Sequence, residues 1–148
     1  YLIVFGSATF SQLLAFSGAS RGLVTWATGF ELDPVLMLLV MFGVLLLLGM
    51  FMEQISMMLL TVPIFFPLAT SFGFDPIWFG IIMLLALEIS FTTPPFGLLL
   101  FVMKGVAPPG TSMREIYLSA LPFIACSLLL VALLIAFPPI ATWLPGLG

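Results

Sequence analysis

The sequence predicts an all-α, polytopic membrane protein, and three observations support this fold class. First, 63% of the 148 residues are hydrophobic and only 6% are charged, whereas a soluble domain carries about 25% charged residues. Second, the apolar stretches approach the roughly 20 residues that a helix needs to cross a bilayer. Third, prolines and glycines interrupt these stretches, which membranes tolerate where the freed backbone groups are buried in protein or line a cavity.

The composition also excludes several functional classes. The net charge of −3 arises from six acidic and three basic residues, which leaves no basic surface for a nucleic acid. The chain has no histidine and a single cysteine, Cys126, so it can form neither a disulfide nor a His/Cys metal site by itself. No glycine-rich phosphate loop is present. We therefore expect a lipid bilayer around the chain, no nucleic-acid partner and no cofactor.

The expected elements follow from the order of apolar and polar stretches. We treat the chain as a C-terminal fragment of one membrane domain, because Tyr1 already lies in an apolar run. Asp33 and Asp75 each precede a proline, a pattern that predicts a helix start capped by aspartate. The expected elements are a transmembrane helix over 1–17, an interfacial loop with a short helix over 18–34, a helical hairpin over 35–70, a broken helix over 77–103 and a last transmembrane helix over 116–144.

The stretch 35–70 consists of two short apolar arms around a polar interruption. Each arm spans roughly 24 Å as a helix, which is less than the roughly 30 Å of hydrocarbon in a bilayer. The interruption, Gly49–Ser56, contains Glu53 but is otherwise less polar than a surface loop. This pattern favours a re-entrant hairpin whose tip lies inside the membrane. Two ordinary tilted spans, with Glu53 in a surface loop, are the alternative.

The stretch 77–103 is apolar with a polar centre. A continuous helix over it would reach roughly 40 Å, which exceeds the thickness of the hydrocarbon core. Pro94–Pro95 cannot donate backbone hydrogen bonds and disfavour helical backbone before them, and Gly97 permits unusual dihedral angles. We therefore predict two half-helices, about Ile77–Phe91 and Phe96–Met103, joined by an unwound link.

The unwound link predicts a cation site. Unpaired carbonyl and amide groups in hydrocarbon cost several kcal/mol each, and broken helices in transporters use such carbonyls to coordinate cations. Thr92 and Thr93 add two hydroxyl oxygens, which suit a hard cation such as Na⁺. The alternative is a proline-kinked helix in which both hydroxyls donate to the preceding turn.

Glu88 lies deep in the same stretch. A carboxylate at this depth costs about 2.5–3.5 kcal/mol on insertion scales and usually faces the interior of a helix bundle. Binding of a proton or cation is one interpretation of Glu88, and a hydrogen-bonded structural role is the other. Lys104 and Arg114 flank the following loop, which the positive-inside rule places in the cytoplasm.

Three strings in this order resemble one known family. They are GMFMEQISMMLLTVPIFFPLA, GFDPIWFGIIM and TTPPFGLLLFV, and they are similar to the large membrane subunit of tripartite ATP-independent periplasmic (TRAP) transporters. The resemblance implies an elevator-type secondary transporter of the bacterial inner membrane, built from two inverted repeats. It also implies Na⁺ as the coupling ion, a small organic acid such as a dicarboxylate as substrate, a periplasmic substrate-binding protein and a small membrane subunit.

The resemblance also implies roles for individual residues. The second-repeat Na⁺ site would lie between the hairpin tip and the helix break, and the substrate would lie nearby. The implied cation-binding residues are Gly49, Glu53, Thr92, Thr93, Pro94 and Gly97, and the implied substrate-binding residues are Ser56, Glu88 and Ser90. Glu53 stands where aspartate is commoner in the family and Ser90 where glycine is common, and these departures indicate a subfamily with a different substrate.

Two other functional classes remain as alternatives. An intramembrane hydrolase would need Glu53 and Glu88 as a close carboxylate pair around a water molecule, but no nucleophile motif accompanies them. A channel or a purely structural subunit is the other class, and a channel would show a continuous polar stripe along one helix, which the sequence lacks. The sequence therefore favours a transporter over an enzyme.

Overall fold

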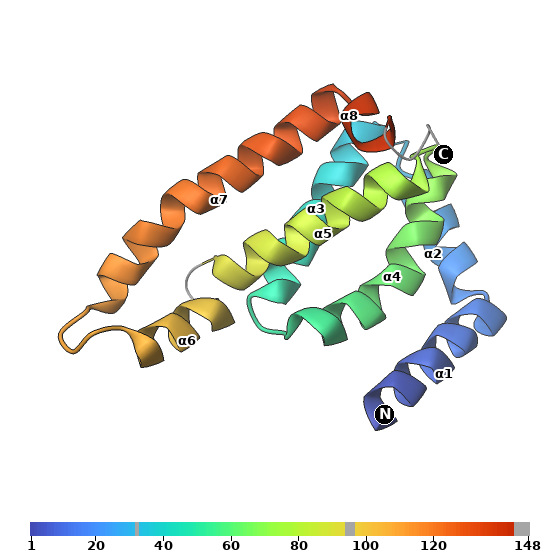
Figure 1. Cartoon of the computed structure of the whole chain (residues 1–148). Helices are drawn as coiled ribbons and strands as arrows, with labels where there is room; N and C mark the ends of the chain where they lie inside the picture. Colours follow the sequence, from blue (N-terminus) through green and yellow to red (C-terminus); the bar gives the residue numbers. More distant parts are fainter. Residues whose placement is uncertain (32, 94–96, 144–148) are drawn as a thin grey trace.

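The computed structural model describes residues 1–31, 33–93 and 97–143, and the secondary structure over these ranges is helical (Figure 1). This confirms the all-α fold class. The helices are α1 (Leu2–Ser17), α2 (Ala19–Thr28), α3 (Pro34–Gly49), α4 (Gln54–Ser71), α5 (Pro76–Thr92), α6 (Leu98–Val106), α7 (Met113–Ala136) and α8 (Pro139–Thr142).

The starts of the helices follow from local sequence. Asp75 is the N-cap of α5, and its Oδ1 accepts hydrogen bonds from the backbone N–H groups of Ile77 at 2.9 Å and Trp78 at 3.0 Å. This satisfies two of the amides that a helix N-terminus leaves unpaired, and it confirms the predicted cap. Asp33 occupies the N-cap of α3 without a side-chain capping bond. Ser112 and Glu115 form a reciprocal capping box at α7.

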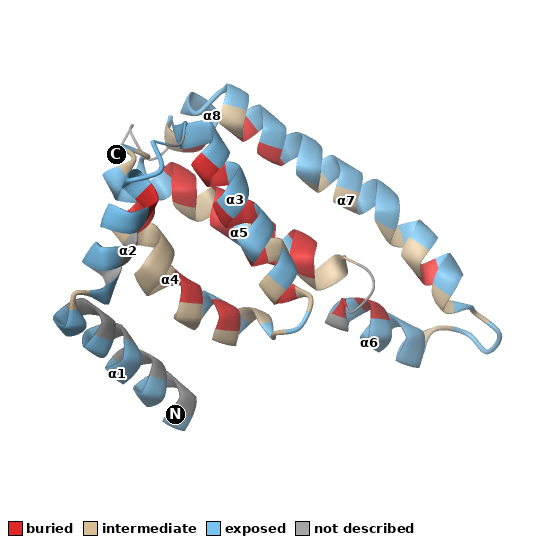
Figure 2. Ribbon diagram, turned by 180° about the vertical axis from the view of Figure 1, so that it is seen from behind, coloured by how far each residue is buried: buried red, intermediate tan, exposed pale blue. Residues whose placement is uncertain are grey.

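The core of the molecule surrounds α5. This helix contacts α3, α4, α6, α7 and α8, and the buried residues gather on the facing sides of α3, α4 and α5 (Figure 2). Phe79 and Ile82 on α5 pack with Leu38 and Leu45 on α3, and all four are at most 2% exposed. The packing of α3 on α5 therefore sets the position of the C-terminal end of α3, at Gly49, relative to the C-terminal end of α5, at Thr92.

A hydrogen bond ties α5 to α7. Trp78 Nε1 donates to the backbone oxygen of Leu134 at 2.7 Å in a buried position. In an α-helix this oxygen would accept from the residue four positions on, which is Pro138 and has no N–H. The proline that ends α7 thus frees a carbonyl oxygen, and the indole of Trp78 satisfies it.

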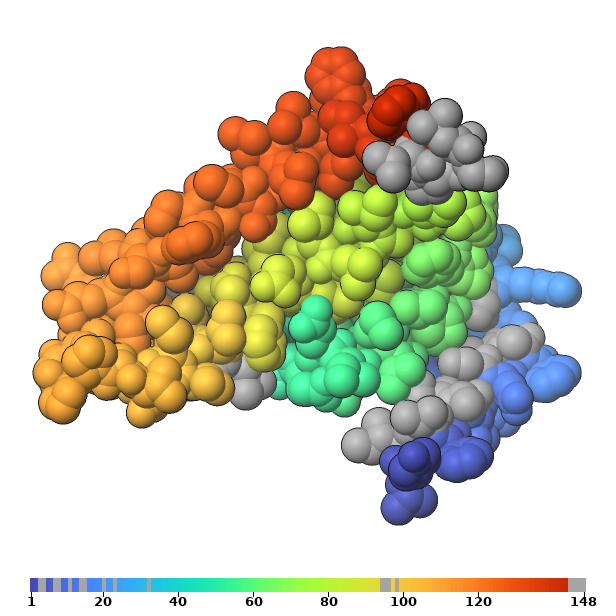
Figure 3. Space-filling view, viewed as in Figure 1, coloured from blue at the N-terminus to red at the C-terminus, as the bar shows by residue number. Residues whose placement is uncertain are grey.

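Two of the described helices, α4 and α7, are long and apolar enough to cross a membrane, whereas α3 and α5 are shorter apolar helices. The outward side of α7 is exposed and apolar, with Leu121, Phe123 and Leu129 among its exposed residues. In the space-filling view α6 and the first turns of α7 lie side by side at the end of the molecule away from α1 (Figure 3). The re-entrant character of residues 35–70 and the inverted repeat stay predictions.

Candidate functional site

The helix break lies between α5 and α6. Helix α5 ends at Thr92 and α6 begins at Leu98. Residues 94–96, which include the predicted cation ligand Pro94, lie outside the described residues. At the end of α5 the N–H of Thr93 donates to Ser90 O at 3.3 Å, and across the break the N–H of Gly97 donates to Thr93 O at 3.1 Å. The two helices are therefore separate segments, as the proline pair predicts.

The prolines free specific carbonyl oxygens at this break. The α-helical donor to Ser90 O would be Pro94, and the donors to Phe91 O at both three and four residues would be Pro94 and Pro95, neither of which has an N–H. A Cβ atom built on Gly97 would lie 2.9 Å from Phe91 O and 3.0 Å from Thr93 O. Two carbonyl oxygens thus converge on a buried glycine that has no side chain to fill the space between them.

The two threonine hydroxyls bond back to α5. Thr92 Oγ1 donates to Ile89 O at 3.0 Å and to Glu88 O at 3.2 Å, and Thr93 Oγ1 donates to Ile89 O at 2.5 Å. The break therefore combines an interrupted helix with the back-bonding of the kinked-helix alternative. A hydroxyl has one proton and two lone pairs. Because the hydroxyl protons of Thr92 and Thr93 are directed into the helix, their Oγ1 atoms would offer lone pairs to a cation.

The turn between α3 and α4, residues 50–53, lies within the predicted tip Gly49–Ser56, is called the tip below, and ends at an acidic N-cap. Glu53 Oε1 accepts from the N–H of Ile55 at 2.6 Å, and Oε2 accepts from Ser56 N at 3.3 Å and from Ser56 Oγ at 2.8 Å. Both carboxylate oxygens of this exposed residue are thus engaged by the first turn of α4. Sequence reasoning missed this role, because the usual capping pattern has serine or threonine at the N-cap and glutamate three residues later, which is the reverse of Glu53 and Ser56. The predicted ligand roles of Glu53 and Ser56 stay predictions.

The tip and the break meet through α3 and α5. Gly49, the last residue of α3, is buried against Ser90, which belongs to the last turn of α5 and is 1% exposed. Ser90 Oγ donates to Leu87 O at 2.7 Å. Of the predicted site residues, the structure therefore brings Gly49 and Ser90 into direct contact, one turn before Thr93.

Glu88 lies on a different side of α5 from Ser90. Residues two apart in a helix point about 200° apart, and Glu88 lines a cavity of about 680 Å³ between α5, α6 and α7 together with Thr92, Glu115 and Ser119. Ser90 faces α3 and the tip. The hydrolase alternative, which needs Glu88 close to Glu53, gains no support from this arrangement. Among the described residues no group of three or more His, Cys, Asp or Glu could hold a metal ion.

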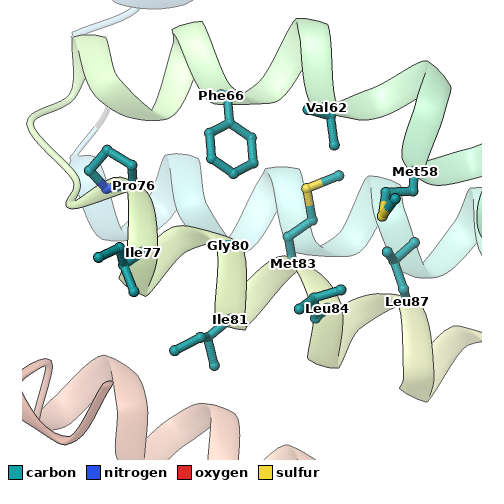
Figure 4. A pocket seen from close by; sticks show the side chains of 10 residues that line it. All are labelled: Met58, Val62, Phe66, Pro76, Ile77, Gly80, Ile81, Met83, Leu84 and Leu87. Atoms are coloured by element: carbon teal, nitrogen blue, oxygen red, sulfur yellow. The ribbon is translucent and has the colours of Figure 1, made fainter. Parts of the chain in front are cut away.

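A second cavity lies between α4 and α5 and has a volume of about 340 Å³. Met58, Val62 and Phe66 of α4 point toward Met83 and Leu87 of α5 across it (Figure 4). The ten lining residues carry no charged group. An organic anion would find no ionic partner there, so this cavity is not a candidate substrate site.

Comparisons with known proteins agree in one family. The family model described as "Tripartite ATP-independent periplasmic transporter, DctM component" matches residues 1–140. The chain is similar to the C4-dicarboxylate TRAP transporter large permease protein DctM of Pseudomonas aeruginosa, at 37% identity over 97% of the chain and 33% of that protein. The protein of the same name from Vibrio cholerae is 40% identical over 78% of the chain and 25% of its own length.

A relative named for another substrate is equally well covered. The sialic acid TRAP transporter large permease protein SiaM of Vibrio cholerae is 32% identical over 99% of the chain and 34% of that protein. The chain spans only 33% of the length of the Pseudomonas aeruginosa DctM protein and 25% of the length of the one from Vibrio cholerae. These relatives are named as transporter permeases and not as enzymes.

Proposed function

Because this chain belongs to the DctM component family of tripartite ATP-independent periplasmic transporters, we propose that it forms the C-terminal third of the large permease subunit of a secondary transporter. The subunit lies in the bacterial inner membrane beside a small membrane subunit. It takes up a small organic acid that a periplasmic substrate-binding protein delivers. The relatives named for C4-dicarboxylates and sialic acid, both of which are carboxylates, support this substrate class.

We propose Na⁺ as the coupling ion on the strength of the break between α5 and α6. The C-terminal end of α5 carries the negative end of its helix dipole. The oxygens of Phe91 and Thr93 converge at Gly97, and Thr92 and Thr93 add two hydroxyls at the same end of α5. An oxygen-only ligand set of carbonyls and hydroxyls is the kind that hard cations prefer. The convergence of oxygens on Gly97 is the observation that carries this proposal.

The substrate carboxylate has its natural partner at the start of α6. This helix begins at the same break, and its N-cap, Gly97, provides no side-chain capping bond. The first amides of a helix lack intrahelical acceptors and attract anions. The start of α4 is less suited, because the Glu53 carboxylate already occupies the amides of Ile55 and Ser56. We therefore place the substrate carboxylate at the Leu98 end of α6, beside the cation.

Binding of both ligands would prepare the domain to move. A cation at the break joins the end of α5 to the start of α6, and the contact of Gly49 with Ser90 links this region to the tip of α3 and α4. With tip, cation and substrate ordered together, the domain can move as a body in an elevator-type cycle. Without the cation, the Phe91 oxygen, whose helical donors would both be prolines, opposes passage through hydrocarbon, because an unsatisfied carbonyl there costs several kcal/mol.

Reconstitution tests this proposal. The full-length subunit with its small membrane subunit and binding protein is placed in proteoliposomes, and uptake of labelled C4-dicarboxylate and sialic acid is measured against Na⁺ and against K⁺. We expect uptake that requires an inward Na⁺ gradient, and counterflow of labelled substrate into preloaded vesicles. Uptake at equal rates in K⁺ would exclude Na⁺ coupling. Flux without counterflow would indicate a channel.

A further inference from the structure

The contact between Gly49 and Ser90 is the closest approach of two helices at any described glycine. A Cβ atom built on Gly49 would lie 2.0 Å from Ser90 Oγ, 2.4 Å from Ser90 Cβ and 3.2 Å from Met57 Sδ. Real Cβ atoms essentially never come within 3.0 Å of such neighbours. The backbone of α3 therefore rests directly on the side chain of Ser90, and only glycine fits at position 49.

The neighbours of Gly49 leave little room for adjustment. Ser90 is 1% exposed and its Oγ is held by the hydrogen bond to Leu87 O. Its Cβ is fixed to the backbone of α5, so it cannot turn away as the end of a long side chain could. Met57, whose Sδ would lie 3.2 Å from the added Cβ atom, is completely buried. Adding a methyl group at position 49 would have to move α3 away from α5 by about 1 Å, the difference between 2.0 and 3.0 Å.

The position of this contact in the chain gives it a consequence for ligand binding. Gly49 is followed directly by the tip, residues 50–53, and Ser90 is the residue whose carbonyl accepts from Thr93 N at the break. In the fold the tip lies next to the end of α5 (Figure 1). A displacement at Gly49 would therefore change the position of the tip relative to the break, and the candidate cation site lies between these two segments.

We propose that Gly49 and Ser90 are a size-matched pair of positioning residues that sets the distance between the tip and the break. Ser90 fills the space that the missing side chain at Gly49 leaves, and neither residue needs to touch the ion. The proposal rests on the proposed Na⁺ coupling and adds a determinant of its affinity. It predicts that the total size of the two side chains matters more than the identity of either.

A swap of side-chain size tests the pair in the reconstituted full-length transporter. Gly49→Ala should raise the Na⁺ concentration for half-maximal uptake by about tenfold or more, since a 1 Å misplacement costs up to ~10²-fold in a positioned site. Gly49→Ala combined with Ser90→Gly should return this concentration to within about threefold of wild type, because volume-conserving exchanges are tolerated best. Gly43→Ala is the matched control, because nothing lies within 4 Å of a Cβ at Gly43 on the same helix.

The outcomes separate positioning from folding. A Gly49→Ala variant that reaches the membrane with lower maximal uptake but an unchanged Na⁺ constant would overturn the proposal, since only structure would have suffered. If that variant does not reach the membrane, the double variant decides: a wild-type Na⁺ constant supports the pair, and its absence from the membrane or a shifted constant refutes it. A wild-type uptake rate that does not depend on the Na⁺ concentration would instead contradict the proposed Na⁺ coupling.

Discussion

At the scale of single residues, the break between α5 and α6 depends on which backbone carbonyl oxygens lack an N–H donor because of the proline pair. The residues three and four positions after Phe91 are both prolines, so neither can donate to its oxygen, whereas Ser90 O accepts the N–H of Thr93 at 3.3 Å. The position of Phe91 before two prolines therefore makes its carbonyl the more available one. Gly97 matters for the same reason, because a side chain there would fill the space beside that oxygen.

Substitution of Thr93 tests the hydroxyl oxygens. Thr93→Val keeps the shape but removes the Oγ1 lone pairs and the bond to Ile89 O. We expect the Na⁺ concentration for half-maximal uptake to rise by about tenfold, which corresponds to about 1.4 kcal/mol, with smaller change in the maximal rate. Titration of uptake with Na⁺ measures it.

Thr70→Val is the matched control for that experiment. Thr70 Oγ1 donates to Phe66 O at 3.0 Å in the same back-bonded way, but it lies at the end of α4 that is remote in sequence from the tip. The control should leave Na⁺ activation unchanged. Equal Na⁺ constants for wild type and Thr93→Val would remove the Thr93 hydroxyl from the site.

At the scale of elements, the buried hydrogen bond from Trp78 to the Leu134 oxygen holds α5 to α7. Trp78→Phe should lower the stability of the protein by about 1–3 kcal/mol, because the buried Leu134 oxygen would lose its donor. Thermal unfolding in detergent measures the effect. Trp26→Phe on the exposed side of α2 is the control and should change stability little. If both variants unfold at the wild-type temperature, the bond between α5 and α7 contributes nothing measurable.

The elements also show how far the sequence can be interpreted. Signals that are local in the sequence could be interpreted: the apolar composition predicted the all-α class, aspartate before proline predicted the Asp75 cap, and the proline pair predicted a break, which lies between Thr92 and Leu98, one to two residues from the predicted bounds. The contact of Gly49 with Ser90 and the bond from Trp78 to Leu134 could not, because they join residues far apart in the chain and no periodicity encodes a partner. The Glu53 cap was missed for a different reason: glutamate is not among the preferred N-cap residues.

At the scale of the whole molecule, helix length bears on how the chain crosses the bilayer. Helix α7 has 24 residues and reaches roughly 36 Å, enough to span roughly 30 Å of hydrocarbon. Helix α3 has 16 residues and reaches only roughly 24 Å. If α3 enters from the side on which α7 ends, its tip stops short of the opposite surface.

Cysteine labelling tests this difference in depth. In a Cys126→Ala background, Phe51→Cys places a thiol at the tip and Pro109→Cys places one in the exposed loop between α6 and α7. We expect a membrane-impermeant maleimide to label position 109 rapidly from the cytoplasmic side, as Lys104 and Arg114 predict. Position 51 should react much more slowly from that side, because a re-entrant tip lies within the membrane, whereas a loop between two full spans would react as fast as position 109. Equal rates would therefore establish two full spans, and the cation site would then have to form without a tip buried at mid-membrane.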